Sequence, residues 1–366
     1  MMGPTIAVPV PSFVIDALTS VQVTVSSGQR SGFQLTFAVS KNSPLNTILL
    51  PAGFFDAPSR VIIVVTLNGT PNVLMDGVIT QQTVAPSNEP GQSTLTVTGE
   101  DISRMMELID LSGQEPYPGM PSEARVALIL AKYAMYGIIP KIIPSISVFI
   151  ETPLERIPTQ QGSDLQYINF LASEVGYVFY VEPGPLPGMN TAYWGPEVKI
   201  GMPQPALSVN MDAETNIESI NFTFDGFSKT LYIGYIQQEE IKVPIPVLIP
   251  DINPLSPPLG LKMPIPLRIE RLSELQSYPI VKAVAVGLAK AAESADVISA
   301  SGQLDVLRYG QILRARGLVT VRGAGITYDG LYYVKSVTHN IKRGEYKQSF
   351  TLSRNALITS LPKVPI

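Results

Sequence analysis

Alternating apolar and polar side chains near the C-terminus predict a half-buried antiparallel strand. In residues 345–352, Tyr346, Phe350 and Leu352 alternate with charged or hydroxyl-bearing side chains. A period of two is typical of a strand with one face on a core and the other in solvent. Gly344 precedes this run and is free to take the positive φ of a tight turn. The end of the chain therefore predicts a long hairpin.

The same order of patterns occurs near the N-terminus, in residues 61–102. There an apolar run, the pair Asp76-Gly77, an alternating segment, a Pro/Gly loop and a second alternating segment follow one another, as they do around Asp329-Gly330. A repeat at a nearly fixed offset indicates a repeated structural unit. We therefore expect two β-barrels of one topology, over residues 15–110 and 205–360.

Between these units the pattern changes to a helical period. A Pro-Ser-Glu start at 121–123 and a stop at Gly137 bound one predicted helix, and Ser163 and Gly176 bound a second. Residues 177–181 are a predicted buried strand. The fold class is therefore mainly β with an α+β insertion. The expected domains are a first antiparallel β-barrel over 1–110, the α+β insertion over 111–204, and a second antiparallel β-barrel over 205–366.

Residues 243–267 combine eight prolines with many large aliphatic side chains. Proline removes a ladder donor and favours extended geometry, so this segment is expected to be an arm or long loop outside any sheet interior. An apolar extended segment is expected to lie against something: its own domain or a neighbouring subunit. The interface candidates are Val243, Ile245, Val247, Leu248, Ile249, Leu255, Leu259, Leu261 and Ile265.

The composition favours a protein that is a subunit of a larger assembly. Charged residues make up 15% of the 366 residues, against about 25% in ordinary soluble domains. Apolar residues reach 45%, yet no run approaches the ~20 apolar residues of a membrane helix. We expect surface that becomes buried between subunits; a soluble protein with a rather neutral surface is the simpler alternative. Nothing predicts membrane anchoring or a secretory signal, so assembly in a cytoplasm is expected.

The chemistry of known active sites is missing from the sequence. The net charge is −4 without a basic run, which argues against sequence-specific nucleic-acid binding, and the absence of cysteine excludes thiolate sites. The single histidine, His339, lies in a predicted strand and is expected to be an ordinary strand residue. The adjacent carboxylates Glu100 and Asp101 are better explained by helix capping at Asp101. We therefore predict no enzyme and no catalytic, cofactor-binding or metal-ligating residue.

Four segments of the chain together carry a resemblance to a known family. Their order and spacing resemble the baseplate hub proteins of contractile phage tails, the late control protein D family, and the related hub portion of VgrG spike proteins. The segments are 94–108, 161–182, 304–325 and 328–355. The second resembles the family's capped helix ending in Glu-x-Gly-aromatic-x-Phe-Tyr, here Glu174 to Tyr180.

The resemblance implies a structural adaptor. It implies two tail-tube-like barrels per chain and a homotrimer, whose six barrels form a ring joining a six-fold inner tail tube to a three-fold central spike. Baseplate wedge proteins are further implied partners, and the implied location is the baseplate of a virion or injection particle. The sequence stops at Ile366, so the spike is expected to be a separate protein. Barrel edge strands are expected to pair between subunits.

Two other readings stay open at the level of sequence. One is a tail-associated β-protein that binds or hydrolyses carbohydrate, which requires a solvent-facing cluster of aromatic and carboxylate side chains. The other is a tail-tube or adaptor subunit, although such tube subunits usually carry a single barrel.

Overall fold

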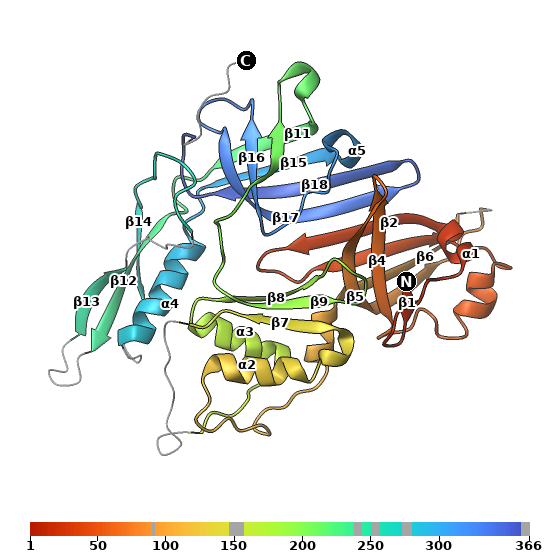
Figure 1. Cartoon of the computed structure of the whole chain (residues 1–366), viewed down its shortest axis with the longest axis horizontal. Coiled ribbons are helices and arrows are strands. Elements are labelled where there is room, and N and C mark those ends of the chain that lie inside the picture. Colours follow the sequence, from red (N-terminus) through yellow and green to blue (C-terminus); the bar gives the residue numbers. More distant parts are fainter. Residues whose placement is uncertain (90–91, 146–156, 238–243, 250–255, 273–279, 360–366) are drawn as a thin grey trace.

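The computed structural model describes residues 1–89, 92–145, 157–237, 244–249, 256–272 and 280–359 (Figure 1). The described part is mainly β, and a 12-stranded sheet runs through both ends of the chain. Its strands are β1 (Met2–Gly3), β2 (Leu18–Ser26), β3 (Gly32–Ala38), β4 (Arg60–Leu67), β5 (Thr70–Ala85), β6 (Thr94–Asp101), β10 (Gln204–Ser208), β11 (Ile217–Phe224), β15 (Ile298–Asp305), β16 (Leu318–Arg322), β17 (Gly330–Lys342) and β18 (Glu345–Arg354).

The large sheet consists of two halves with the same strand order. The first half runs β4-β5-β6-β3-β2, and the second runs β16-β17-β18-β15-β11; every neighbouring pair within each is antiparallel. Bulges fall at equivalent places in the two halves. Thr19 in β2 corresponds to Glu218 in β11, and Thr80 in β5 corresponds to Lys335 in β17. The repeat expected from the sequence is therefore present as a repeated strand order. Among the described residues the strand path is open, and no closed barrel is found.

The bulges correct the alignment on which the repeat was predicted. Matching the bulge at Thr80 to that at Lys335 makes Asp76 equivalent to Leu331, two residues beyond Asp329. The two Asp-Gly pairs also differ in role. Asp76 lies inside β5 and is buried, whereas Asp329 precedes β17 and accepts a hydrogen bond from the backbone N–H of Ala324 at 2.8 Å. The two Asp-Gly pairs thus belong to equivalent strands, but they do not occupy equivalent positions in those strands.

The two halves are joined strand to strand. β2 pairs antiparallel with β17, with Thr24 opposite Thr338 and Val23 opposite His339. The hydroxyl oxygens of Thr24 and Thr338 lie 3.0 Å apart. Each half packs its own apolar cluster beneath the sheet, around Val23, Leu35 and Leu95 in the first and around Ala300, Val337 and Phe350 in the second. The halves therefore form one continuous sheet over two cores, and Figure 1 shows β2 beside β17 where they meet.

The predicted α+β insertion forms a compact layer below the first half in Figure 1. Its three-stranded sheet has the order β7-β9-β8, with β7 (Ile138–Ile142), β8 (Val178–Pro183) and β9 (Asn190–Gly195), and it packs with α2 (Ser122–Ala131) and α3 (Asp164–Glu174). The predicted cap at Ser163 is confirmed, because its side chain accepts from the N–H of Gln166 within a capping box. Gly137 and Gly176 have positive φ at the predicted helix stops.

A second small sheet contradicts part of the expectation for the proline-rich segment. Its order is β13-β12-β14, with β12 (Thr230–Gln237), β13 (Pro244–Ile249) and β14 (Arg268–Leu272), and α4 (Ile280–Glu293) packs on it. Prolines 244 and 246 thus lie in a regular strand, although at a sheet edge. Residues two apart on a strand point their backbone N–H positions to the same side, so an edge strand accommodates both prolines when that side faces away from its neighbour.

Several short helices connect these strands. They are α1 (Ser12–Ala17), the π-helix η1 (Leu45–Leu49), the 3₁₀ helices η2 (Ile102–Glu107), η3 (Ala134–Tyr136) and η4 (Asp212–Glu214), and α5 (Val306–Tyr309). The helix predicted after Asp101 is η2, and the Asp101 carboxylate accepts from the N–H of Ser103 as expected of a cap. Helices α1 and η1 were not predicted, because the chain before Asp101 was interpreted as strands of the first β-barrel.

Candidate functional site

One face of the 12-stranded sheet is polar across both halves, and its charged side chains, Glu100, Asp305, Lys342, Glu345 and Lys347, lie toward the ends of their strands. Strand alternation places buried apolar residues on one side and hydroxyl or amide side chains on the other, and the registers align these side chains from strand to strand. We call this surface the polar face. It comprises Ser20, Gln22 and Thr24 of β2, Gln34 and Thr36 of β3, Thr94, Thr96 and Thr98 of β6, Thr338 and Asn340 of β17, Lys347, Ser349 and Thr351 of β18, Ser299, Ser301 and Gln303 of β15, and Ser219, Asn221 and Thr223 of β11.

The charge on the polar face is locally balanced. Lys347 makes ion pairs with Glu218 at 2.8 Å and Glu345 at 3.3 Å. On the polar face, the side-chain contacts between β2 and β17 join neutral groups, among them the hydrogen bond from Gln22 Nε2 to Asn340 Oδ1 at 3.3 Å. Such a surface hydrogen-bonds to water and offers little field to a charged molecule of either sign. In the sequence, the polar face is visible as Thr, Ser and Gln residues at every second position of the strands. This alternation was interpreted only as the solvent side of single strands.

His339 lies beneath the polar face, where it lines a second cavity together with Arg314 and Arg316. It is buried in β17, where its Nδ1 lies 2.8 Å from the hydroxyl of Tyr346. Burial lowers the pKa of His339 to about 4, and the nearby cation of Arg314 acts in the same direction. The ring is therefore neutral at pH 7, in agreement with the expectation of an ordinary strand residue.

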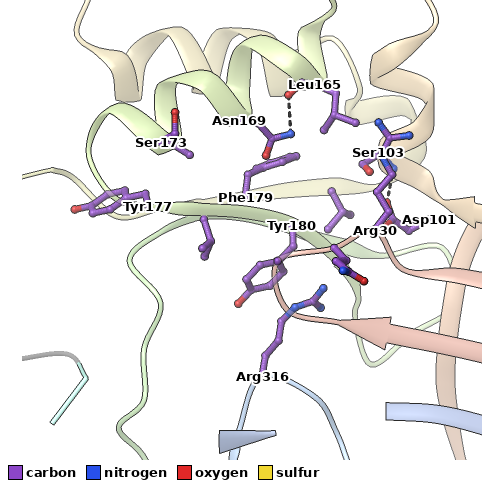
Figure 2. Close-up of a pocket in the computed structure, with 15 residues that line it drawn as sticks. Arg30, Asp101, Ser103, Leu165, Asn169, Ser173, Tyr177, Phe179, Tyr180 and Arg316 are labelled. Atoms are coloured by element: carbon purple, nitrogen blue, oxygen red, sulfur yellow. Dashed lines mark hydrogen bonds between the residues drawn. The ribbon is translucent and has the colours of Figure 1, made fainter. Parts of the chain in front are cut away.

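A cavity of about 340 Å³ lies where the α+β layer meets the large sheet (Figure 2). Tyr177, Phe179 and Tyr180 of the β8 region line it together with Asp101 and Arg316. The guanidinium of Arg316 lies 4.0 Å from the centre of the Tyr180 ring and donates to the backbone carbonyl of Ser26 at 2.7 Å. Arg316 therefore joins the second half to both the first half and the α+β layer.

The cavity combines aromatic side chains with a single carboxylate among its described lining residues, that of Asp101. Burial raises the pKa of Asp101, whose carboxylate accepts from the backbone N–H groups of Ser31 and Ser103 at 3.1 and 3.0 Å. Glycoside hydrolysis commonly uses two carboxyl groups across the substrate. The arrangement instead fits a structural cap and supplies no second carboxylate for the hydrolytic reading.

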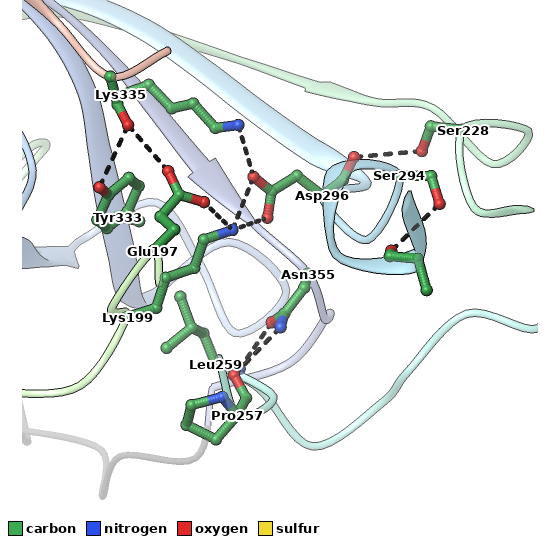
Figure 3. Close-up of polar contacts among 12 residues, drawn as sticks. Glu197, Lys199, Ser228, Pro257, Leu259, Ser294, Asp296, Tyr333, Lys335 and Asn355 are labelled. Atoms are coloured by element: carbon green, nitrogen blue, oxygen red, sulfur yellow. Dashed lines mark hydrogen bonds and ion pairs between the residues drawn. The ribbon is translucent and has the colours of Figure 1, made fainter. Parts of the chain in front are cut away.

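A buried charge cluster fixes the exit from the α+β layer to the second half (Figure 3). The ammonium of Lys199, only 2% exposed, lies 2.9 Å from Asp296, and the ammonium of Lys335 lies 3.0 Å from the same carboxylate. Burial alone would raise the pKa of Asp296, but the two ammonium groups outweigh it and hold the pKa below its usual value. The ion pairs hold Lys199 against the second half of the sheet, and this packing role accounts for the buried charges.

The candidates in the proline-rich segment separate into four groups. Val243 and Leu255 lie outside the described residues, and Ile245 and Val247 lie in β13. Ile249 and Leu259 are buried within their own chain: Ile249 packs with α4, and Leu259 packs on Leu318 and Tyr333. Leu248, Leu261 and Ile265 are 60, 71 and 79% exposed and remain available to a partner.

No group of residues suited to a metal ion occurs in the described ranges. Within the same ranges, no helix has the length and apolar character needed to cross a bilayer.

Comparison with solved structures identifies the fold. A tail protein from Neisseria meningitidis MC58 aligns with a TM-score of 0.64 at 13% identity, over 92% of each chain. The 43 kDa tail protein of prophage MuSo2 from Shewanella oneidensis aligns with a TM-score of 0.63 at 13% identity, over 93% of this chain and 95% of that one. The fold is that of a phage tail protein.

The tail-protein fold extends to secretion machinery. A component of the Escherichia coli type VI secretion system, itself described as similar to bacteriophage T4 tail proteins, aligns with a TM-score of 0.51 at 12% identity, over 95% of this chain and 78% of that one. No model of a known protein family matches the sequence, and no curated protein does. The fold is therefore baseplate-hub-like, and membership of the late control protein D family stays a prediction.

Proposed function

We propose that this chain is a structural subunit of a baseplate hub, in a contractile phage tail or a related injection particle. Three copies form a ring of six tube-like units, two from each chain, between the inner tail tube and a separate central spike. The domains are those expected from the sequence, with boundaries near residues 110 and 204, and the chain has no enzymatic role. The proposed location is the baseplate, after assembly in the bacterial cytoplasm.

The observation that carries this proposal is the polar face on a repeated sheet. Two units of one strand order, joined edge to edge, are what a six-fold ring built from three chains requires. A neutral polar surface on the concave side of such a ring suits a channel, because cargo of either charge passes without strong binding. The tail-protein fold of the structural neighbours supports the same role.

The runner-up, a carbohydrate-binding or hydrolytic tail protein, has less support. Its best location is the cavity at Asp101, where a second carboxylate is lacking among the described lining residues. A tail-tube subunit with a single barrel is also less suitable, since the chain carries two units of the same strand order.

Native mass spectrometry of the full-length chain, with negative-stain electron microscopy of the same sample, tests the proposal. We expect a species of three chains and a ring with a central channel. A stable monomer at micromolar concentration, or a closed ring with another number of chains, would contradict it.

A further inference from the structure

Besides the outer edges of β1 and β10, two edges of the large sheet lack a strand partner among the described residues. One is the outer edge of β11, which pairs only with β15. The other is the end of β5 beyond its contact with β4, from Gln81 to Ala85. Residues 80–89 are exposed without interruption. An unpaired edge exposes backbone donors and acceptors that readily pair with another strand.

The internal repeat indicates which strand belongs on each edge. Within the chain, β2 of the first half pairs with the end of β17 of the second half. In the repeat, β11 is the equivalent of β2, and β5 is the equivalent of β17. The free edge of β11 is thus the edge that β2 uses, and the free end of β5 is the edge that β17 uses. The pairing of β2 with β17, which we call the finished joint, is complete within the chain. The chain also contains both edges that an equivalent second joint requires.

We propose that β11 of one chain pairs antiparallel with residues 81–87 of a second copy of this chain. The proposal rests on the trimeric hub proposed above and specifies how its subunits meet. Because the two surfaces differ, the contact is head-to-tail, and such contacts form a ring when the rotation closes. Alternation of the finished joint and the new one would give six similar joints around three chains.

The equivalent bulges fix the register of the proposed joint. Thr24 lies five residues after the bulge of β2, and Thr223 lies five residues after the bulge of β11. Thr338 lies three residues after the bulge of β17, and Thr83 lies three residues after the bulge of β5. The pair Thr24 and Thr338 therefore corresponds to Thr223 and Thr83. A threonine pair is therefore present at the same point of both joints. In the finished joint these hydroxyl groups lie 3.0 Å apart.

The same register matches the two faces of the strands. It places Val84 opposite Phe222 on the apolar side, while Thr83 and Thr223 continue the polar face from one chain to the next. In the single chain Val84 is 44% exposed and Phe224, on the same side of β11 as Phe222, is 42% exposed. A slip of one residue would place Val84 opposite a polar-face residue, Thr223 or Asn221, so the side-chain pattern excludes odd shifts and the bulges select this register.

Cysteine cross-linking tests the register cleanly because the chain has no cysteine. The variants Thr83→Cys and Thr223→Cys are co-expressed as separate chains, oxidised mildly and separated on non-reducing denaturing gels. We expect a two-chain product that neither variant forms alone. The double variant should give products up to three chains and none larger.

Two control pairs accompany this test. Asn221→Cys with Thr83→Cys is shifted by two residues on the same face, where diagonal neighbours lie about 7–8 Å apart, and should cross-link at least about tenfold less. Thr24→Cys with Thr338→Cys in one chain should form an internal disulfide and so report that the finished joint is folded.

The outcomes separate this inference from the function on which it rests. If the unmodified chain sediments as three copies but the Thr83–Thr223 product does not exceed the Asn221 control, the strand pairing is wrong and the hub stands. If the chain sediments as a monomer, both are wrong. Cross-linked ladders that extend beyond three chains would support the strand pairing and contradict the closed hub.

Discussion

Single buried ion pairs hold the layers of this molecule together, and Arg60 with Asp76 is the most completely buried example described. The guanidinium donates to both oxygens of Asp76, at 2.8 and 2.6 Å, and also to the backbone carbonyl of Tyr136 at 2.8 Å. Both side chains are almost inaccessible, at 4 and 0% exposed. The pair therefore links β4 and β5 to the α+β layer.

Arg60→Met should destabilise the chain strongly, because it leaves the carboxylate of Asp76 buried without its cation. We expect a loss of about 3–5 kcal/mol in the free energy of unfolding, measured by urea denaturation. Arg268→Met is the matched control: its pair with Glu270 is exposed and should contribute less than about 1 kcal/mol. Equal shifts of the two midpoints would contradict this account of the buried pair.

His339 makes stability dependent on pH. Its pKa is lowered to about 4 in the fold, mainly by burial and further by Arg314, while an unfolded histidine titrates near pH 6.5. The unfolded state therefore binds a proton first, and the free energy of unfolding falls as the pH drops from about 6.5 to 4. At about 1.4 kcal/mol per pH unit, the loss approaches about 3 kcal/mol.

The comparison of wild type with His339→Gln measures this contribution. In urea denaturation at pH 7 and pH 4.5, the variant should show a smaller loss of stability on acidification. Tyr346, which contacts the ring from β18, remains protonated because burial raises its pKa. The same pH dependence in both proteins would show that His339 is not the group responsible.

At the scale of elements, the sequence predicted those strands and helix ends that depend on the local order of residues. The alternation around Tyr346 and Phe350 gave a strand because a single pattern of burial explains it, and β18 buries both side chains. The stops at Gly137 and Gly176 were predictable because an αL residue ends a helix and glycine adopts that conformation most easily. The repeat was also visible, since both copies keep the same order of runs and loops.

Tertiary context decided the remaining elements. Pro244 and Pro246 argued against a sheet, yet the strand they occupy lies at an edge, and nothing in the local sequence distinguishes an edge from an interior position. The two-residue offset between Asp76 and Asp329 is seen only when β5 and β17 are aligned on their bulges at Thr80 and Lys335, and the pairing partners determine where a bulge occurs. The polar face was not predicted as a surface because its residues are brought together only by registers between distant strands.

The proline-rich segment offers a test in which buried and exposed leucines respond differently. Leu259 is 4% exposed, and its backbone N–H donates to Asn355 Oδ1 at 2.8 Å. Leu259→Ala should therefore lower the free energy of unfolding by about 2–5 kcal/mol. The double variant Leu261→Ser with Ile265→Ser should leave stability within about 0.5 kcal/mol and weaken attachment of a neighbouring subunit or spike.

Thermal unfolding of each variant and co-sedimentation with the assembly separate these effects. If the exposed pair unfolds the chain as much as Leu259→Ala does, these side chains belong to the chain's own core and have no assembly role.

For the whole molecule, the polar face predicts a protected channel in the assembly. Gln22→Cys places a thiol on that face, and Leu186→Cys places one at an exposed position of the α+β layer. Both should react with a small maleimide. A maleimide carried by a bulky globular protein should react with Gln22→Cys at least about tenfold more slowly, because a closed ring excludes it. Equal reaction at both thiols would show that the polar face is open to solvent.

Electron cryomicroscopy of the intact particle that contains this chain tests the central claim most directly. We predict that the chain occupies the junction between the inner tail tube and the spike, as three copies forming six similar lobes around a channel lined by the polar face. Density for the chain along the length of the tube, in peripheral fibres, or at the junction in another number of copies would contradict the account.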